Sequence, residues 1–162
     1  MFIKKVIQAL LANRIDYALV GGYAVSLHGA VRGTVDVDLV VSMEAESLLG
    51  LERAMNSLGL VSRLPVSAKD IAQFRDEYIN KRNLKAWSFT NPNLPTEVVD
   101  VTILYDLSQF KVISKKTIFG EVRLVSIGDL IRMKKEAGRP QDLADIEALQ
   151  FIQKESRGEG NG

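Results

Sequence analysis

The stretch Val35-Asp-Val-Asp-Leu-Val-Val41 decides the fold of this chain and indicates where its chemistry lies. Its residue types favour a β-strand, in which successive side chains point to opposite faces. Asp36 and Asp38 would therefore share one face, roughly 6 to 7 Å apart along the strand. Two carboxylates this close repel each other unless a cation lies between them, and hard divalent cations prefer carboxylate oxygens. The alternative is an exposed edge strand whose carboxylates are solvated.

The composition narrows what such a site can contain. The 162 residues fit one domain with a hydrophobic core, and the net charge of +1 provides no bulk attraction to nucleic acid or to a membrane surface. Because the chain has no cysteine and a single histidine, His28, thiolate sites and multi-histidine metal sites are excluded. Any metal is then held by oxygen, which indicates Mg²⁺ or Mn²⁺.

Nothing in the sequence is typical of a targeted or membrane-embedded chain. The N-terminus lacks the pattern of a signal peptide, and no apolar run is long enough for a membrane span. We therefore expect a soluble cytoplasmic protein.

Helical and strand patterns alternate along the chain. Helices are expected over 2–12, 23–28, 44–58, 68–81, 127–137 and 140–154, and strands over 17–20, 35–41, 60–62, 85–90, 97–104, 117–119 and 122–125. This alternation predicts an α/β (α+β) fold, with one mixed twisted sheet flanked by helices in a single domain over residues 1–154. Residues 155–162, which include three glycines, are expected to form a disordered C-terminal tail.

A second predicted strand repeats the layout of the first. In Glu97-Val-Val-Asp-Val-Thr-Ile103, alternation places Asp100 on the face opposite Val99 and Val101. If this strand is a neighbour of the first, Asp36, Asp38 and Asp100 meet on one face. Three such ligands suffice for two Mg²⁺ ions, which clamp the attacking and leaving oxygens in phosphoryl-type transfer. Taken alone, Asp100 is equally consistent with a solvated strand residue.

Two further patterns are consistent with an anionic ligand. Gly21-Gly22 joins a predicted strand to a helix, where free backbone N–H groups attract a phosphate, although a tight turn is the commoner role of such a pair. Around the junction of the last two helices lie Lys134, Arg139, Asp142 and Asp145. Either the cations neutralise nucleotide phosphates, or these residues form a capped helix pair with surface ion pairs.

Other residues offer weaker indications. His28, near a helix end, is more typical of a structural hydrogen-bonding role than of catalysis. A nucleic-acid surface built from Lys81, Arg82, Lys85 and the lysines of 111–116 is a third interpretation, which the near-neutral net charge disfavours.

These pieces together resemble a known family. The segment Val20-Gly-Gly-Tyr-Ala-Val-Ser-Leu-His-Gly29, followed by Arg32-Gly-Thr34 and Asp36-Val-Asp38, resembles the nucleotidyltransferase superfamily, in which a third acidic residue lies on a later strand. The stretch from Lys134 to Asp145 resembles its minimal AbiEii-like branch, found among bacterial toxin–antitoxin and phage-abortive systems. Many superfamily members have Gly-Ser where this chain has Gly-Gly, so a serine hydroxyl contact to phosphate is missing.

The resemblance implies a nucleotidyltransferase fold and an enzyme that moves a nucleoside monophosphate from a nucleoside triphosphate, such as ATP, to a hydroxyl on RNA, a protein or a small molecule. It implies Mg²⁺ or Mn²⁺ as cofactor and, for a toxin, a cognate antitoxin protein as partner. A catalytically silent binding or regulatory module on the same fold is the alternative. The resemblance assigns metal binding to Asp36, Asp38 and Asp100, catalysis to these three and Lys134, and nucleotide binding to Gly21, Gly22, Arg32, Thr34, Arg139 and Asp142.

Overall fold

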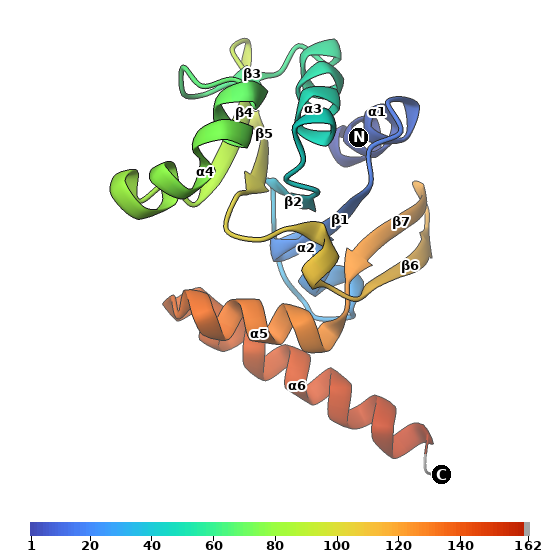
Figure 1. Ribbon diagram of the computed structural model, residues 1–162. Helices are drawn as coiled ribbons and strands as arrows, with labels where there is room; N and C mark the ends of the chain where they lie inside the picture. Colours follow the sequence, from blue (N-terminus) through green and yellow to red (C-terminus); the bar gives the residue numbers. More distant parts are fainter. Residues whose placement is uncertain (161–162) are drawn as a thin grey trace.

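The structure is a computed structural model that describes residues 1–160 (Figure 1). Its helices are α1 (Phe2–Ala12), α2 (Gly21–Leu27), α3 (Ala45–Ser57), α4 (Ala68–Arg82), α5 (Ile127–Ala137) and α6 (Pro140–Gly160), with a short 3₁₀ helix η1 (Leu107–Gln109). Its strands are β1 (Tyr17–Val20), β2 (Val37–Val41), β3 (Val61–Ser62), β4 (Ala86–Asn91), β5 (Leu94–Thr102), β6 (Val112–Thr117) and β7 (Gly120–Val125).

The strands form one mixed sheet in the order β3-β4-β5-β2-β1-β7-β6. β1 runs antiparallel to β2 and parallel to β7, and β2 runs parallel to β5. The hairpins β4–β5 and β6–β7 complete the two sides of the sheet, and β3 pairs with β4 at one edge. The predicted mixed sheet flanked by helices is confirmed.

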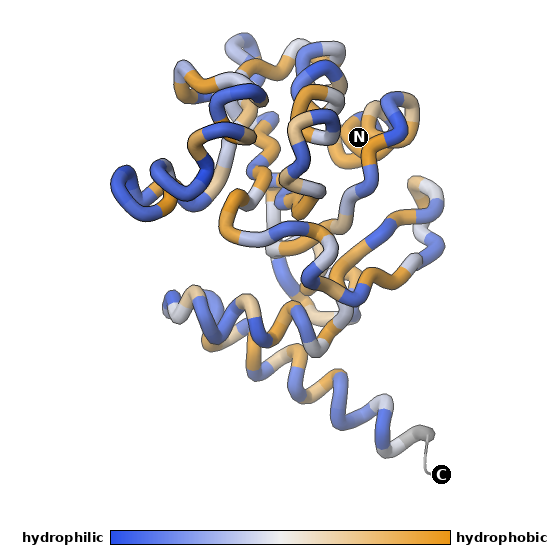
Figure 2. Tube along the Cα trace, in the orientation of Figure 1, coloured by the Kyte–Doolittle hydropathy of each residue, from blue (hydrophilic) through white to orange (hydrophobic). Residues whose placement is uncertain are grey.

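The helices gather in two groups around this sheet. α3 packs against both α1 and α4, and α6 packs along α5. Figure 1 shows the first group in the upper part of the view and the α5–α6 pair crossing below the strands. Figure 2 shows the hydrophobic residues concentrated along the strands and the inward sides of the helices, while α4 is largely hydrophilic.

The core explains why the central strands form. All four residues of β1 are buried, and Val37, Leu39, Val40 and Val41 of β2 are fully buried. Such apolar, β-branched runs are typical of strands covered on both faces. α1 buries the stripe Ile3, Val6, Ile7 and Leu10 in this core, as its helical spacing predicts.

The strand that carries the aspartate pair is shorter than its sequence predicts. β2 begins at Val37, so Val35 and Asp36 lie in the preceding connection, and Val35 is 62% exposed. The reason is the absence of pairing partners at this end. Pairing with β1 ends at Val20 opposite Asp38, because the chain turns into α2 at Gly21, and pairing with β5 begins at Val37. The prediction that Asp36 and Asp38 share a strand face is therefore wrong for Asp36.

Several other boundaries differ from the prediction, among them those of β5, which runs over Leu94–Thr102 rather than 97–104. α2 begins at Gly21 rather than Tyr23, and the β6–β7 turn lies at Ile118 and Phe119 rather than at Gly120 and Glu121. β6 begins at Val112, since its pairing with β7 begins there, whereas the sequence predicts a strand only from residue 117.

The C-terminal helix is longer than expected. α6 continues to Gly160, so residues 155–160 extend the helix predicted to end at Lys154 instead of forming a disordered tail. Residues 161–162 of that predicted tail lie outside the described residues. Over residues 1–160, no helix is both long enough and apolar enough to cross a membrane.

Candidate functional site

A cleft of about 1290 Å³ opens between the sheet and the α5–α6 pair. Its walls come from the β1–α2 junction, the loop 30–36, β2, β4, β5, α5 and the turn that leads into α6. The cleft brings together every site residue named from the sequence: Gly21, Gly22, Arg32, Thr34, Asp36, Asp38, Asp100, Lys134, Arg139 and Asp142.

The sheet register places two of the aspartates side by side. Asp38 of β2 is the direct partner of Asp100 on the parallel strand β5. The predicted adjacency of these two strands is therefore confirmed. On the next strand, Ser88 lies opposite Asp100, and its hydroxyl donates a hydrogen bond of 2.5 Å to Asp100 Oδ1. Asp36 reaches the same cleft from the connection before β2.

The three aspartates leave this wall of the cleft strongly negative. None of them forms an ion pair with a cation of the described chain. Burial, followed by repulsion from Asp100 and Asp36, raises the pKa of Asp38 to about 7. Burial, followed by repulsion from Asp100, also raises the pKa of Asp36. Both shifts reflect a concentration of negative charge that a cation placed between these carboxylates would relieve.

The donor chemistry of this wall fits Mg²⁺ or Mn²⁺. The converging donors are carboxylate oxygens, which hard cations prefer, and no lysine or arginine of the described residues forms a direct ion pair with them. As the side chains stand in residues 1–160, no three acidic or histidine side chains are close enough to form a ready-made metal site. The residues that would hold the ion are Asp36, Asp38 and Asp100.

The glycine pair is shaped by its contacts with the cleft residues. Gly21 has a φ of +66°, and a Cβ at this position would lie 2.2 Å from Asp38 Oδ2. A Cβ on Gly22 would lie 2.7 Å from Oγ1 of Thr34. The backbone at the start of α2 therefore approaches Asp38 and Thr34 more closely than any other residue type would permit. A serine in place of Gly22 would therefore clash with the Thr34 side chain in its present position.

The opposite wall carries cations partly neutralised by buried carboxylates. Lys134 of α5 is 6% exposed, and its Nζ lies 3.4 Å from Asp142 Oδ1 and 2.9 Å from Asp145 Oδ2. Arg139 donates from Nε to Asp142 Oδ2 at 2.8 Å, and Arg32 donates from Nε to Asp145 Oδ1 at 3.1 Å. Among these five side chains, three positive charges against two negative charges leave a net charge of +1, and Lys134 and Arg139 are close enough to lower the pKa of Asp38.

Several lining residues were not anticipated from the sequence. They are mostly apolar: Ala86, Thr102, Leu104, Tyr105, Leu130, Met133, Glu136 and Ala137. Lys85, named from the sequence only as part of an alternative nucleic-acid surface, also lines the cleft. The alternation that singles out Asp100 also places Thr102 and Leu104 on its face. The helical spacing of Leu130, Lys134 and Ala137 would likewise have indicated that one face of α5 lines the cleft.

One hydrogen bond links two of these lining residues. The Tyr105 hydroxyl donates to Glu136 Oε2 and so joins the segment after β5 to α5. Burial, together with this hydrogen bond and the Glu136 charge, raises the pKa of Tyr105 to about 12.

The remaining sequence candidates lie away from the cleft. His28 Nε2 is 2.9 Å from the carbonyl oxygen of Val125, which accepts its hydrogen bond, so the structural interpretation of His28 is confirmed. Lys81 and Arg82 do not line the cleft, nor do the lysines of 111–116.

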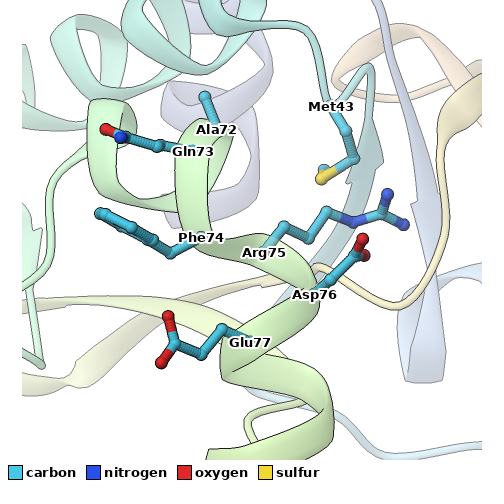
Figure 3. A pocket seen from close by; sticks show the side chains of 7 residues that line it. All are labelled: Met43, Ala72, Gln73, Phe74, Arg75, Asp76 and Glu77. Carbon is cyan, nitrogen blue, oxygen red and sulfur yellow. The ribbon is translucent and has the colours of Figure 1, made fainter.

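A smaller hollow lies on α4 (Figure 3). Its volume is about 410 Å³, and it is lined by Met43 and residues 72–77, where the helix kinks at Phe74. Figure 3 shows the Arg75 side chain extending past Met43, and Arg75 Nε donates to the carbonyl of Ile103 at 2.6 Å. This hollow contains none of the predicted site residues.

Comparison with known proteins identifies the fold. No protein-family model matches the chain, and no curated protein matches it by sequence. Among solved structures, the lincosamide antibiotic adenylyltransferase LnuA with lincomycin bound has a TM-score of 0.65 at 12% identity, covering 93% of this chain and 96% of its own. ANT(2'')-Ia in complex with adenylyl-2''-tobramycin has a TM-score of 0.58 at 14% identity, covering 97% and 95%.

A third structure belongs to the same class. An antigenic nucleotidyltransferase-like protein from Paracoccidioides brasiliensis has a TM-score of 0.54 at 21% identity, covering 91% of this chain and 73% of its own. Together these likenesses show that the chain has the nucleotidyltransferase fold, as its sequence predicts. The AbiEii-like branch stays a prediction.

Proposed function

We propose that this protein is a metal-dependent nucleotidyltransferase, which moves a nucleoside monophosphate from a nucleoside triphosphate to a hydroxyl and releases pyrophosphate. The observation that carries the proposal is the charge pattern of one cleft on a nucleotidyltransferase fold. Asp36, Asp38 and Asp100 lie without protein cations on one wall, and Arg32, Lys134 and Arg139 lie on the other. A magnesium–triphosphate complex has the complementary charges.

The wall residues have distinct roles in this proposal. Asp36, Asp38 and Asp100 would hold Mg²⁺ or Mn²⁺, which when bound neutralises charge on the triphosphate. Backbone N–H groups at Gly21 and Gly22, the Thr34 hydroxyl and the three cations hold the phosphates, and Asp142 keeps Arg139 in place.

Asp100 is suited to act as the general base. The Ser88 hydroxyl occupies its Oδ1, which leaves Oδ2 to accept the proton of the attacking hydroxyl. The hydroxyl oxygen then forms a bond to the α-phosphorus as the bond to pyrophosphate breaks. Most of the acceleration comes from positioning and charge neutralisation.

The acceptor is a hydroxyl on RNA, a protein or a small molecule. LnuA is described as an antibiotic adenylyltransferase, and ANT(2'')-Ia was solved with an adenylylated aminoglycoside. The AbiEii-like resemblance adds a toxin neutralised by a cognate antitoxin protein. Growth arrest on expression of the wild type but not of Asp36→Asn would support the toxin role, and unaffected growth with active enzyme would contradict it.

The test of the activity is direct transfer. The protein is incubated with each α-labelled nucleoside triphosphate, Mg²⁺ or Mn²⁺, and total RNA, protein and small-molecule hydroxyl pools. We expect labelled product from the wild type and a loss of about 100-fold or more in Asp36→Asn. The matched control is Asp16→Asn, because Asp16 is an exposed aspartate that pairs with Arg123 outside the cleft. Equal transfer by Asp36→Asn and the wild type would contradict the proposal.

A further inference from the structure

Asp145 does not line the cleft, but it contacts two cations that do. α6 places it three residues after Asp142, and it is 3% exposed. Lys134 Nζ lies 2.9 Å from its Oδ2, and Arg32 Nε donates to its Oδ1 at 3.1 Å. Gln141 Nε2 also donates to Oδ1, at 3.2 Å. Both oxygens of this buried carboxylate are thus engaged with groups from three parts of the chain.

Burying a carboxylate costs free energy unless charges compensate it. Burial alone would raise the pKa of Asp145, but the close ion pair with Lys134, together with Gln141 and Arg32, outweighs it and keeps this pKa below its usual value. Asp145 is therefore ionised at neutral pH. Within residues 1–160 it is the only carboxylate that pairs with Arg32, whereas Lys134 has a second partner in Asp142 at 3.4 Å.

The pairing with Arg32 also fixes a loop of the cleft. Residues 30–36 form no helix or strand, yet they carry Thr34 and Asp36. Two contacts hold Arg32 in this loop: the Ser26 hydroxyl donates to its carbonyl at 2.7 Å, and its side chain donates to Asp145. Asp145 thereby links α6 to the loop that approaches the aspartates and to Lys134 of α5.

We propose that Asp145 is a positioning residue that acts mainly by holding Arg32 in the orientation in which it contacts the phosphates of the donor nucleotide, because Lys134 is also held by Asp142. This inference rests on the proposed nucleotidyltransferase function. Asp145 itself touches no substrate. If the Asp145 carboxylate is removed, the Arg32 side chain keeps only the carbonyl of Gly33 as a partner among the described residues. This long, flexible side chain is then no longer ordered before the phosphates bind.

The test measures binding of phosphate chains rather than turnover. Magnesium tripolyphosphate, which has no base, and the four magnesium nucleoside triphosphates are titrated into the protein by calorimetry. For Asp145→Asn we expect a Kd raised about tenfold for every probe, at a temperature where circular dichroism shows the variant folded. The matched control is Glu147→Gln, an exposed carboxylate on the same helix without an ion pair in the described chain, which should keep the wild-type Kd.

A double-mutant cycle separates positioning from a merely structural role. In an Arg32→Gln background, Asp145→Asn should raise the Kd by much less than tenfold, because the residue acts largely through Arg32. A full tenfold effect in that background would overturn the proposed route. If Asp145→Asn does not fold, Asp145→Glu takes its place, since it keeps the charge but displaces it by one methylene. A Kd raised about threefold or more would then support the proposal, and an unchanged Kd would overturn it.

The binding experiments distinguish loss of the proposed function from loss of the positioning role of Asp145. If the wild type binds none of the probes in the presence of Mg²⁺, the proposed function falls and the role of Asp145 with it. If the wild type binds them and folded Asp145→Asn binds them equally well, only the positioning role of Asp145 is overturned.

Discussion

At the scale of single residues, the site depends on atoms that approach one another unusually closely. Gly21 adopts a φ of +66° and faces Asp38, and the hydroxyl of Ser88 reaches Asp100 at 2.5 Å. The sequence shows the glycine pair and the aspartates as separate motifs. Their contact arises because β1 ends opposite Asp38, where α2 begins.

Gly21→Ala should disrupt the site through this contact. The new Cβ would lie 2.2 Å from Asp38 Oδ2 and would also be strained by the positive φ, so we expect loss of nucleotide transfer and destabilisation by about 2 kcal/mol. The measurements are labelled transfer and urea unfolding. The matched control is Gly59→Ala, where φ is +79° and a Cβ meets nothing within 4 Å. It should lose stability but keep activity, and equal activity losses in both variants would contradict the explanation.

The pKa of Asp38 predicts a pH-dependent stability. The unfolded carboxyl loses its proton near pH 4, whereas the folded one loses it near pH 7. Because the folded state holds this proton more tightly, the free energy of unfolding falls as the pH rises from about 4 to 7. Asp38→Asn removes the charge, so it should stabilise the protein by about 2 kcal/mol at pH 8 and by little at pH 4. Urea unfolding at both values checks this, and an equal effect at both would refute it.

At the scale of elements, α4 contributes to stability without lining the cleft, whereas α5 and the start of α6 form part of it. α4 lies outside the cleft and is capped by Ser67, whose hydroxyl accepts from the Asp70 backbone N–H while Asp70 accepts from the Ser67 backbone N–H. α5 and the start of α6 carry Lys134, Arg139 and Asp142 and form one wall of the cleft.

Ser67→Ala should therefore affect stability without affecting the site. Loss of the N-cap leaves the first backbone N–H groups of α4 without this acceptor and should cost about 1 kcal/mol, measured as a lower urea midpoint. Transfer activity below the transition should equal that of the wild type. A selective loss of activity would show that α4 takes part in the reaction.

At the scale of the whole molecule, the sheet and the α5–α6 pair together define the cleft. The aspartates belong to β2, β5 and the connection before β2, while the cations belong to the loop 30–36, α5 and the turn before α6. A ligand that bridges the two walls joins elements from both ends of the sequence, and it should stabilise the fold as a unit.

Divalent metal and nucleotide should accordingly raise the melting temperature in steps. We expect Mg²⁺ at pH 8 to raise the Tm of the wild type by relieving repulsion among the aspartates, and a nucleoside triphosphate to raise it further. In Asp38→Asn the metal-dependent rise should shrink. Differential scanning fluorimetry with Mg²⁺ and with a chelator checks this, and an undiminished shift in Asp38→Asn would contradict the assignment of Asp38 to the metal.

The sequence by itself determined the α/β class, most of the helices and strands, and the charged and glycine residues that line the cleft. It did so because hydrophobic periodicity and the glycines at the ends of helices and strands are local signals, and because Asp38 and Asp100 stand at equivalent positions of two strands. Only the tertiary structure decided that Asp36 leaves the strand, that Gly21 contacts Asp38, and that Asp145 pairs with Arg32, 113 residues away. The physical reason is that strand ends and buried ion pairs depend on partners brought together by folding, and no local pattern records those partners.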